Sequence, residues 1–462
     1  MVRIFRHYVS PVKLTLAVMD FMVFLGAVFL AEWLRYSYLD LHLSSNAQSM
    51  VAKVLVPVII LPILLGVGGY QSDALRDTRV FFVRLGAAVF GAAIILSAAL
   101  FMLPTLPLWR SILVLTIVLG ASVVFLVHWL MLHFADYRFL GRNVIVLGAG
   151  ENAQELVDYA ARAPEAGLNI VKVVALPGGK NLVEGAVQLG DIPIFDKYAH
   201  ESQAEMILIA EDLGIELLIE ELIACKLSGI EVKDRLSFYE QVRGYVDLSS
   251  VKAEWIIFSD GFKGGSGFER LAKRLLDITV SSVLLIAALP IMIFAGIAIK
   301  TTSRGSVFYR QERVGRYGKS FKLLKFRSMK EDAEAEGQAE WAQENDPRIT
   351  LVGTFLRRTR IDELPQVVNV LRGHMSFVGP RPERPFFVDQ LQKDVPFYRE
   401  RHCLKPGITG WAQIQYPYGA SFEDSKRKLE YDLYYIKNYS IFLDLLIILQ
   451  TVRVLLFPIG VR

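Results

Sequence analysis

Asp362 and Glu363 are adjacent carboxylates in a strongly basic stretch of the chain. The sequence around them runs Arg357-Arg-Thr-Arg-Ile-Asp-Glu-Leu-Pro365. Proline is favoured in the first helical turn, so we expect the pair at a helix N-terminus, whose positive pole favours carboxylates and phosphate. Carboxylates beside guanidinium groups indicate Mg²⁺ and phosphate: one carboxylate could bind the metal while the other attacks phosphorus. A surface salt-bridge network is the alternative, and residue types alone do not decide between the two.

Two further basic clusters occur in the same part of the chain, Lys325-Phe-Arg-Ser-Met329 and Gly379-Pro-Arg-Pro382. Cations at this density are costly unless anions match them, which again indicates phosphate. Seven acids lie within residues 331–346. They could form a second metal site, but a solvated helix or lid is the more usual structure for such a run. We expect structural roles for His374 and His402.

The composition indicates a membrane protein with a globular part. Of 462 residues, 53% are hydrophobic and 21% charged, which argues against an ordinary soluble enzyme and against a disordered chain. The net charge of +4 is too small to indicate nucleic acid. The two cysteines exclude a disulfide scaffold. Four apolar runs near the N-terminus are each long enough to cross a bilayer: Val12–Ala31, Val51–Tyr70, Val80–Leu103 and Leu108–Leu132.

Lys and Arg in the short loops predict the orientation of these spans. Basic residues concentrate before the first span, between the second and third, and after the fourth. By the positive-inside rule, the N-terminus and everything after the fourth span should be cytoplasmic.

A β–α alternation follows the spans and predicts a parallel α/β domain. Strands are expected at Arg142–Ala149, Asn169–Ala175, Met206–Ala210 and Gly229–Val232. The first strand ends in Gly148-Ala-Gly-Glu-Asn-Ala153, which resembles the glycine-rich turn of dinucleotide-binding domains. The second strand lacks the carboxylate that would hold a ribose. Nucleotide binding and a ligand-free Rossmann-like scaffold both stay open, and the missing carboxylate favours the scaffold.

A fifth apolar run, Ile278–Ile299, has basic residues on both sides. A straight span cannot place both flanks in the cytoplasm. Pro290, near its middle, removes a helix hydrogen bond and bends the chain. We therefore expect a re-entrant pair of half-helices, broken at Pro290, that enters and leaves on the cytoplasmic face. The last apolar run, Ile441–Val461, is interrupted by polar residues and is expected to be an interfacial or packed helix.

Residues 268–462 resemble the bacterial sugar transferase family of polyprenyl-phosphate glycosyl-1-phosphate transferases. The matching segments are Phe308-Tyr-Arg-Gln-Glu-Arg-Val-Gly315, Lys325-Phe-Arg-Ser-Met329, Asp362-Glu-Leu-Pro-Gln366, Asn369-Val-Leu-Arg-Gly373, Met375-Ser-Phe-Val-Gly-Pro-Arg-Pro382 and Lys405-Pro-Gly-Ile-Thr-Gly-Trp411. The whole chain resembles the large exopolysaccharide-type undecaprenyl-phosphate hexose phosphotransferases. The segments Phe238-Tyr-Glu240 and Phe258-Ser-Asp-Gly261 are similar to exosortase-associated versions.

The resemblance implies a membrane α plus α/β architecture. Its expected segments are a four-helix transmembrane bundle (1–137), a Rossmann-like, CoA-binding-like domain (138–260), a glycine-rich linker (261–267), a re-entrant membrane helix (268–300), an α-rich cytoplasmic phosphoglycosyl transferase domain (301–440) and a C-terminal interfacial helix (441–462).

The resemblance also implies a mechanism. Asp362 would attack the β-phosphorus of a UDP-sugar and release UMP, and undecaprenyl phosphate would then attack the covalent aspartyl phosphosugar. Glu363 would hold Mg²⁺, for which Mn²⁺ could substitute. Substrate phosphate would bind Arg357, Arg381, Lys325 and Arg327. The expected sugar is glucose, then galactose; the other expected partners are membrane lipids and a second copy of the chain. The expected location is the bacterial inner membrane, with the Rossmann-like and catalytic domains in the cytoplasm.

Two other functions are alternatives to sugar-phosphate transfer. An NDP-sugar epimerase or dehydratase with NAD on the Rossmann unit would need a Tyr-x-x-x-Lys base, but Tyr159, Tyr198 and Tyr239 are not followed by such a lysine. A non-enzymatic nucleotide-binding membrane sensor would leave Asp362 and Glu363 unexplained. Release of UMP separates all three.

Overall fold

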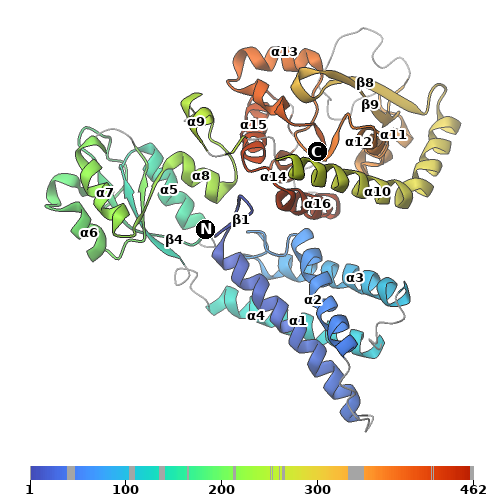
Figure 1. Cartoon of the computed structure of the whole chain (residues 1–462), viewed down its shortest axis with the longest axis horizontal. Helices are drawn as coiled ribbons and strands as arrows, with labels where there is room; N and C mark the ends of the chain where they lie inside the picture. Colours follow the sequence, from blue (N-terminus) through green and yellow to red (C-terminus); the bar gives the residue numbers. More distant parts are fainter. Residues whose placement is uncertain are drawn as a thin grey trace. The chain divides into compact units, whose positions relative to one another are not determined.

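The computed structural model describes residues 2–38, 47–102, 110–134, 141–163, 166–211, 215–249, 251, 253–259, 261–262, 266–330, 348–417, 419 and 421–457. The chain forms two compact units (Figure 1). The first comprises Met1–Ile4 and Tyr8–Arg243, and the second Phe5–His7 and Gly244–Arg462.

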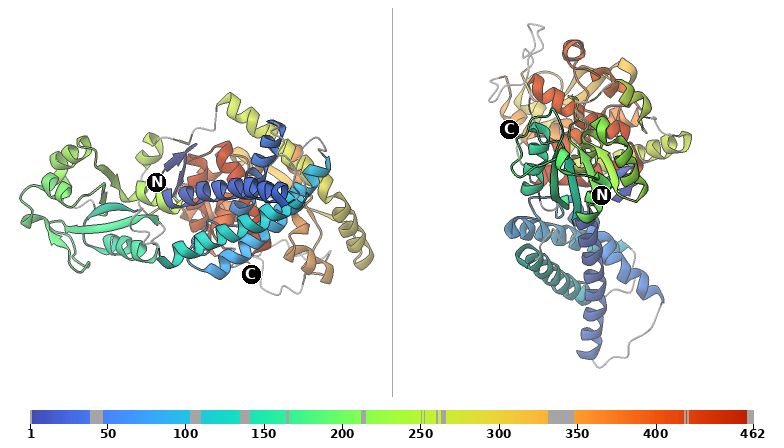
Figure 2. Two further views of the ribbon diagram at one scale, coloured as in Figure 1. Left: turned by 90° about the horizontal axis from the view of Figure 1, so that it is seen from below. Right: turned by 90° about the vertical axis from the view of Figure 1, so that its left-hand side faces the viewer.

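The N-terminal part of the first unit consists of long apolar helices, as predicted. They are α1 (Pro11–Tyr38), α2 (Ala47–Gly66), α3 (Thr78–Met102) and α4 (Arg110–Phe134). By length and composition α1, α3 and α4 could each cross a membrane, and α2 contributes a shorter apolar segment, Met50–Gly66. Views from two directions show α1 alongside α4 (Figures 1 and 2). Inside this bundle Tyr70 donates a 2.8 Å hydrogen bond to the buried Asp20, whose carboxylate also lies 3.2 Å from His128 Nε2.

The same unit contains a five-stranded parallel sheet in the order β5-β4-β3-β6-β7. The strands are β3 (Arg142–Leu147), β4 (Leu168–Ala175), β5 (Val187–Gln188), β6 (Met206–Ile209) and β7 (Glu231–Asp234). Side chains alternate between two cores: Val144 and Val146 pack on one face, Ile145 and Leu147 on the other. The predicted α/β pattern is confirmed. The strand predicted at Gly229–Val232 begins later, because Gly229 has φ +101° and belongs to the preceding turn.

Helices cover both faces of this sheet, which is why its central strands are apolar throughout. They are α5 (Glu151–Arg162), α6 (Phe195–Glu201), α7 (Ile219–Leu227) and α8 (Arg235–Arg243). The strand order places the turn between β3 and α5 at the point where the direction of strand addition reverses, which is where ligands bind in many such sheets.

The second unit begins with α9 (Ala253–Phe258) and α10 (Gly267–Thr302). A capping box between Ser266 and Glu269 starts α10. This helix has 36 residues and includes Pro290, where the sequence predicted a break between two half-helices. Figure 1 shows α10 changing direction between its ends. Its apolar middle is open, with Ile286 75% and Phe294 73% exposed.

The rest of this unit is mostly helical, with two small sheets. Its elements are the antiparallel hairpin β8 (Phe308–Val314) and β9 (Ser320–Phe326), α11 (Leu351–Arg358), α12 (Gln366–Leu371), β10 (Ser376–Val378), α13 (Pro385–Asp394), β11 (Gly407–Thr409), α14 (Trp411–Gln415), α15 (Phe422–Lys437) and α16 (Ile441–Leu456). β10 pairs in parallel with β11. One face of α16 is buried through Leu443, Asp444 and Ile447, so the helix packs against its unit, while Leu455 and Leu456 are exposed.

Candidate active site

A tight turn between α11 and α12 presents Asp362 and Glu363. They lie in a single 3₁₀ turn, Ile361–Glu363, directly after Arg360, which adopts a left-handed conformation with φ +59°. This conformation is uncommon for a residue other than glycine and often marks functional sites. The pair precedes a helix, as predicted, but Pro365 is the N-cap of α12 rather than part of its first turn. Because α12 has only six residues, side-chain cations rather than a long helix dipole must balance the two carboxylates.

Glu363 is held by cations from three separate segments. Its Oε1 lies 3.0 Å from Lys325 Nζ at the end of β9 and 3.0 Å from Arg381 Nη2 in the loop after β10. Arg360 Nη1 lies 3.8 Å from Oε2. Burial alone would raise the pKa of Glu363, but these cations outweigh it and hold that pKa well below the ordinary range. Glu363 is therefore ionised and firmly fixed.

Asp362 has a different environment from its neighbour. It is 6% exposed, and within the described residues its carboxylate makes no hydrogen bond and no ion pair. Burial and the negative charge of Glu363 raise the pKa of Asp362, against the opposing effects of Lys325, Arg357 and Arg360. No donor in the described part of the chain occupies the lone pairs of its oxygens, which is the state a nucleophilic carboxylate needs.

The charges around the two carboxylates favour an additional anion. Lys325, Arg357, Arg360 and Arg381 are the leading cations that act on Asp362 and Glu363, so positive charge is in excess among these six groups. Burial lowers the pKa of Lys325, with Glu363 opposing the shift. Arg357 makes no hydrogen bond and no ion pair with the part of the chain that the structure describes, so its guanidinium is available to a substrate. A diphosphate placed beside Asp362 would balance this excess.

Arg327 binds the C-terminal end of α10, the helix that includes Pro290. Arg327 is 8% exposed, and its Nη2 donates to Ser303 O at 3.1 Å and to Ser303 Oγ at 2.7 Å, at the C-terminus of α10. It is not among the leading charges that shift the pKa of Asp362 or Glu363. The structure thus brings together Asp362, Glu363, Arg381 and Lys325, with Arg357 among the cations that act on Asp362, and it bonds Arg327 Nη2 to Ser303 at the end of α10.

The residues present suit a magnesium ion that takes part of its ligands from the substrate. No group of three potential metal ligands occurs among the described residues. Glu363 Oε2 accepts no hydrogen bond from the described chain, and the Asp362 carboxylate beside it is similarly open. Mg²⁺ commonly binds one or two carboxylates plus substrate phosphates, which fits this donor set. The acidic run at residues 331–346 lies outside the described residues.

We assign His402 no part in this chemistry. Burial and the neighbouring Arg401 lower the pKa of His402 to about 4, so it is neutral at physiological pH. Sequence reasoning missed Arg360 as a member of the site. The available signal was its spacing of three residues before Glu363 within the same basic cluster, which places two side chains on one side of a helical turn.

The glycine-rich turn of the parallel sheet is filled by the chain itself. Glu211, just after β6, lies against this turn, because a methyl group at Gly150 would overlap Glu211 Oε1. Glu211 also lies close to the loop after β4, where a methyl group at Gly179 would be 3.3 Å from Glu211 Oε2. Leu182 N also donates to Ala149 O at 2.7 Å, which draws the loop after β4 over the turn. A carboxylate therefore occupies the space that glycines would leave for a pyrophosphate.

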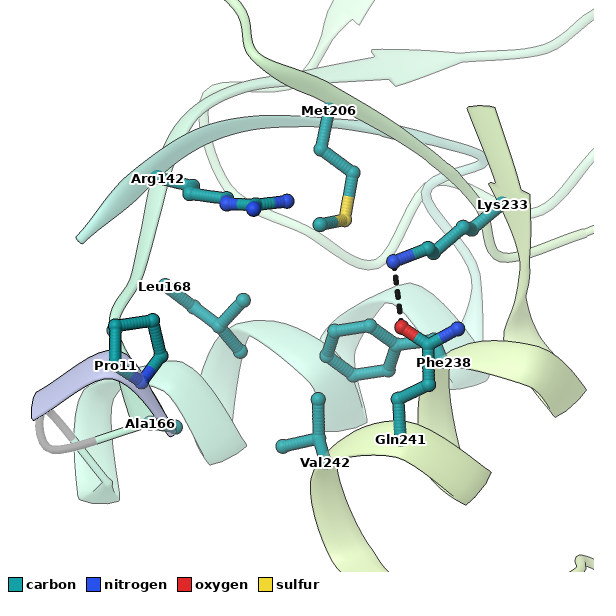
Figure 3. A pocket seen from close by; sticks show the side chains of 10 residues that line it. Pro11, Arg142, Ala166, Leu168, Met206, Lys233, Phe238, Gln241 and Val242 are labelled. Atoms are coloured by element: carbon teal, nitrogen blue, oxygen red, sulfur yellow. Dashed lines mark hydrogen bonds between the residues drawn. The ribbon is translucent and has the colours of Figure 1, made fainter. Parts of the chain in front are cut away.

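A small pocket lies at the opposite, amino-terminal edge of this sheet (Figure 3). Leu168, Met206 and Phe238 give it an apolar lining. Its basic residues are already engaged, because Arg142 contacts Glu231 at 2.7 Å and Lys233 hydrogen-bonds Gln241. It contains none of the groups that the chemistry above requires.

The chain is similar to one family model and to several known proteins. The family model described as bacterial sugar transferase matches residues 268–458. The chain is 46% identical to the UDP-N-acetylgalactosamine-undecaprenyl-phosphate N-acetylgalactosaminephosphotransferase of Aeromonas hydrophila, over 52% of this chain and 56% of that protein. It is 34% identical to the UDP-glucose:undecaprenyl-phosphate glucose-1-phosphate transferase of Xanthomonas campestris pv. campestris, over 68% and 66%.

A shorter relative is matched almost completely. The chain is 42% identical to the exopolysaccharide production protein PSS of Rhizobium leguminosarum bv. phaseoli over 39% of this chain and 92% of that protein. The alignments span about half to two thirds of the two longer relatives, at 56% and 66% of their lengths. The chain belongs to the bacterial sugar transferase family.

Proposed function

We propose that this protein transfers a hexose-1-phosphate from a UDP-sugar to undecaprenyl phosphate and releases UMP. The observation that carries the proposal is the contrast within the carboxylate pair. Asp362 is buried with open oxygens, while Glu363 is fixed between Lys325 and Arg381 at 3.0 Å. Relatives with this reaction in their names support the same substrates.

Each residue of the site has a task in this reaction. An Asp362 oxygen attacks the β-phosphorus, the bond from that phosphorus to the bridging oxygen breaks, and UMP leaves with the electron pair. An aspartyl phosphosugar remains. A phosphate oxygen of undecaprenyl phosphate then attacks the same phosphorus and releases the Asp362 carboxylate. Arg357 and Arg381 bind phosphate oxygens throughout, and Lys325 neutralises charge beside them.

The proposal includes Mg²⁺, or Mn²⁺ in its place, held by Glu363 Oε2 with Asp362 nearby. The ion would neutralise diphosphate charge next to the reacting phosphorus. Arg360, 3.8 Å from the same Oε2, is too far for a hydrogen bond and leaves that oxygen available.

A re-entrant path for α10 is part of the proposal, and both ends of the helix support it. Arg274 donates to Val370 O and Leu371 O at 2.7 Å, while Ala295 and Ile299 pack against Phe326. These two contact regions are neighbours, because Leu324 N donates to Asn369 Oδ1 at 2.9 Å. A straight helix of 36 residues would extend about 54 Å and separate its ends across a bilayer of about 30 Å.

The proposed location is the inner membrane, with the site at its cytoplasmic face. A donor made in the cytoplasm and an acceptor phosphate held at headgroup level both require this placement. UDP-glucose is the proposed donor, because the Xanthomonas relative aligns with 68% of this chain. UDP-N-acetylgalactosamine is the second candidate because of the Aeromonas relative, and UDP-galactose is the third. A homodimer stays an expectation.

An NAD-dependent epimerase or a nucleotide sensor is disfavoured by the contacts of Glu211. Its carboxylate fills the glycine-rich turn and would repel a pyrophosphate there. We propose that the parallel sheet is a ligand-free scaffold.

The experiment is a donor screen with the purified full chain in detergent, undecaprenyl phosphate and each UDP-sugar, with UMP as the product. Asp362→Asn should abolish release, and the wild type with donor alone should carry a sugar-phosphate adduct on Asp362. Asp389→Asn, an exposed carboxylate on α13, is the matched control and should behave as wild type. Normal UMP release by the Asp362→Asn protein would end the nucleophile assignment.

A further inference from the structure

Donors from other segments hold the loop that carries Arg381 through its backbone carbonyl groups. Lys273 Nζ and Tyr435 Oη each lie 3.3 Å from Val378 O. Gly407 N donates to Pro380 O at 2.9 Å. Arg401 Nη2 donates to Arg381 O at 3.1 Å, and Arg313 Nη1 donates to Pro382 O at 2.9 Å. Three of these donors are cations that do not touch Glu363. These five donors, here called the clamp, fix the backbone of the loop between Val378 and Pro382. The Arg381 side chain extends from this loop to Glu363 in the candidate site.

Arg401 is the member of this clamp that contacts Arg381 itself. It is 6% exposed and uses both ends of its guanidinium. Nη2 also contacts Asp432 Oδ2 at 2.8 Å, and Nη1 donates to Tyr398 Oη at 2.6 Å. Asp432, on α15, is 1% exposed. A lysine could not reproduce this arrangement, because an ammonium lacks the planar fork that binds several acceptors at fixed angles.

The backbone at Arg381 transmits this contact to the side chain. Arg381 stands between Pro380 and Pro382, so its neighbours have fixed φ angles and Arg381 is itself confined to extended conformations. Anchoring its carbonyl therefore places its Cα, and with it the guanidinium that lies 3.0 Å from Glu363 Oε1. Phosphate groups in a reacting complex must be held within fractions of an ångström.

The burial of this ion pair also argues for a role beyond stability. Desolvation of two charges offsets most of their attraction, so apolar residues of similar size commonly stabilise a protein equally well or better. The geometry that the pair imposes on its partners is therefore the contribution to examine.

We propose that Arg401 and Asp432 form a positioning pair that sets the phosphate-binding geometry of Arg381. The inference rests on the proposed function, in which Arg381 binds the donor diphosphate. Arg401 touches no substrate and acts through the Arg381 carbonyl.

The test compares Arg401→Gln and Arg401→Lys with a control on the same helix as Asp432. Arg427→Gln removes the pair between Arg427 and Glu430, which does not contact the loop among the described residues. Both Arg401 variants should lower kcat/KM by about 10- to 100-fold, mainly through a higher KM for the UDP-sugar. The KM for undecaprenyl phosphate and the whole profile of the control should not change.

A double-mutant cycle decides whether Arg401 acts through Arg381. In an Arg381→Ala background, Arg401→Gln should cause little further loss, because the side chain that it positions is gone. A merely structural role would give additive losses and unchanged KM values, and that outcome would overturn the proposal.

Hydrogen exchange provides a readout that does not depend on activity. Arg401→Gln should speed amide exchange at residues 376–384, and Arg427→Gln should not. Equal exchange in both variants would refute the clamp. If the wild type released no UMP with any donor, the proposed function would fail, while this measurement would still decide whether Arg401 holds the loop.

Discussion

Neutralising Glu363 should lower stability, whereas neutralising Asp362 should not. In the Glu363→Gln protein, Lys325 and Arg381 lose a partner at 3.0 Å in a site where the Glu363 side chain is 12% exposed. Removing one member of a buried pair costs about 3–5 kcal/mol, and the remaining exposure favours the lower end, about 3 kcal/mol. For a domain of this size that corresponds to a Tm lower by roughly 6–12 °C.

Asp362→Asn should leave Tm unchanged or raise it. The pKa of Asp362 is raised by burial, so the folded state binds a proton more readily than the unfolded state does, and stability falls as pH rises through that pKa. An uncharged asparagine would avoid the cost of burying this charge. The Asp362→Asn protein should therefore also lose this slope of stability against pH.

Thermal unfolding in detergent, followed by tryptophan fluorescence, measures both effects, because Trp411 is buried in the same unit. Both variants should lack transfer activity, so activity alone does not separate them. If Asp362→Asn lowered Tm as much as Glu363→Gln, Asp362 would have a stabilising partner, and the open carboxylate inferred above would be wrong.

The path of α10, the Asp432 carboxylate and the glycine-rich turn each give one further prediction. With Arg270→Cys or Arg304→Cys, both exposed, an impermeant thiol reagent should label neither site in intact cells; labelling at 304 alone would contradict the re-entrant path. Burial raises the pKa of Asp432 to about 6, so below pH 6 its protonation should weaken the contact with Arg401 and raise the donor KM, a change that Asp432→Asn should abolish. Gly150→Ala should lower Tm by displacing Glu211 yet retain transfer activity; loss of transfer in a folded variant would implicate the turn in catalysis.

Much of the fold could be predicted because the patterns involved are local. Apolar runs of about 20 residues predict spans at any position in a chain. The alternation of Val144, Ile145, Val146 and Leu147 likewise predicts a strand buried on both faces. Pro290 was harder to interpret, because a proline can bend a helix without ending it: α10 continues through Pro290 where two half-helices were expected.

The partners of the site residues could not be predicted in this way. Lys325, Glu363 and Arg381 lie on three segments separated by 38 and 18 residues, and no periodicity relates them. The same holds for Glu211, which no pattern connects to the glycine-rich turn that it fills.

The sequence by itself determined the residue types of the site, the membrane helices and the parallel sheet, because charge, hydropathy and short motifs act over a few neighbouring residues. Only the tertiary structure distinguished the two carboxylates. Adjacent in the chain, Asp362 and Glu363 face different surroundings: one is buried with open oxygens and the other is fixed by cations from distant segments. That difference arises from packing, which alone decides which charges meet in a low-dielectric interior and so which carboxylate is free to react.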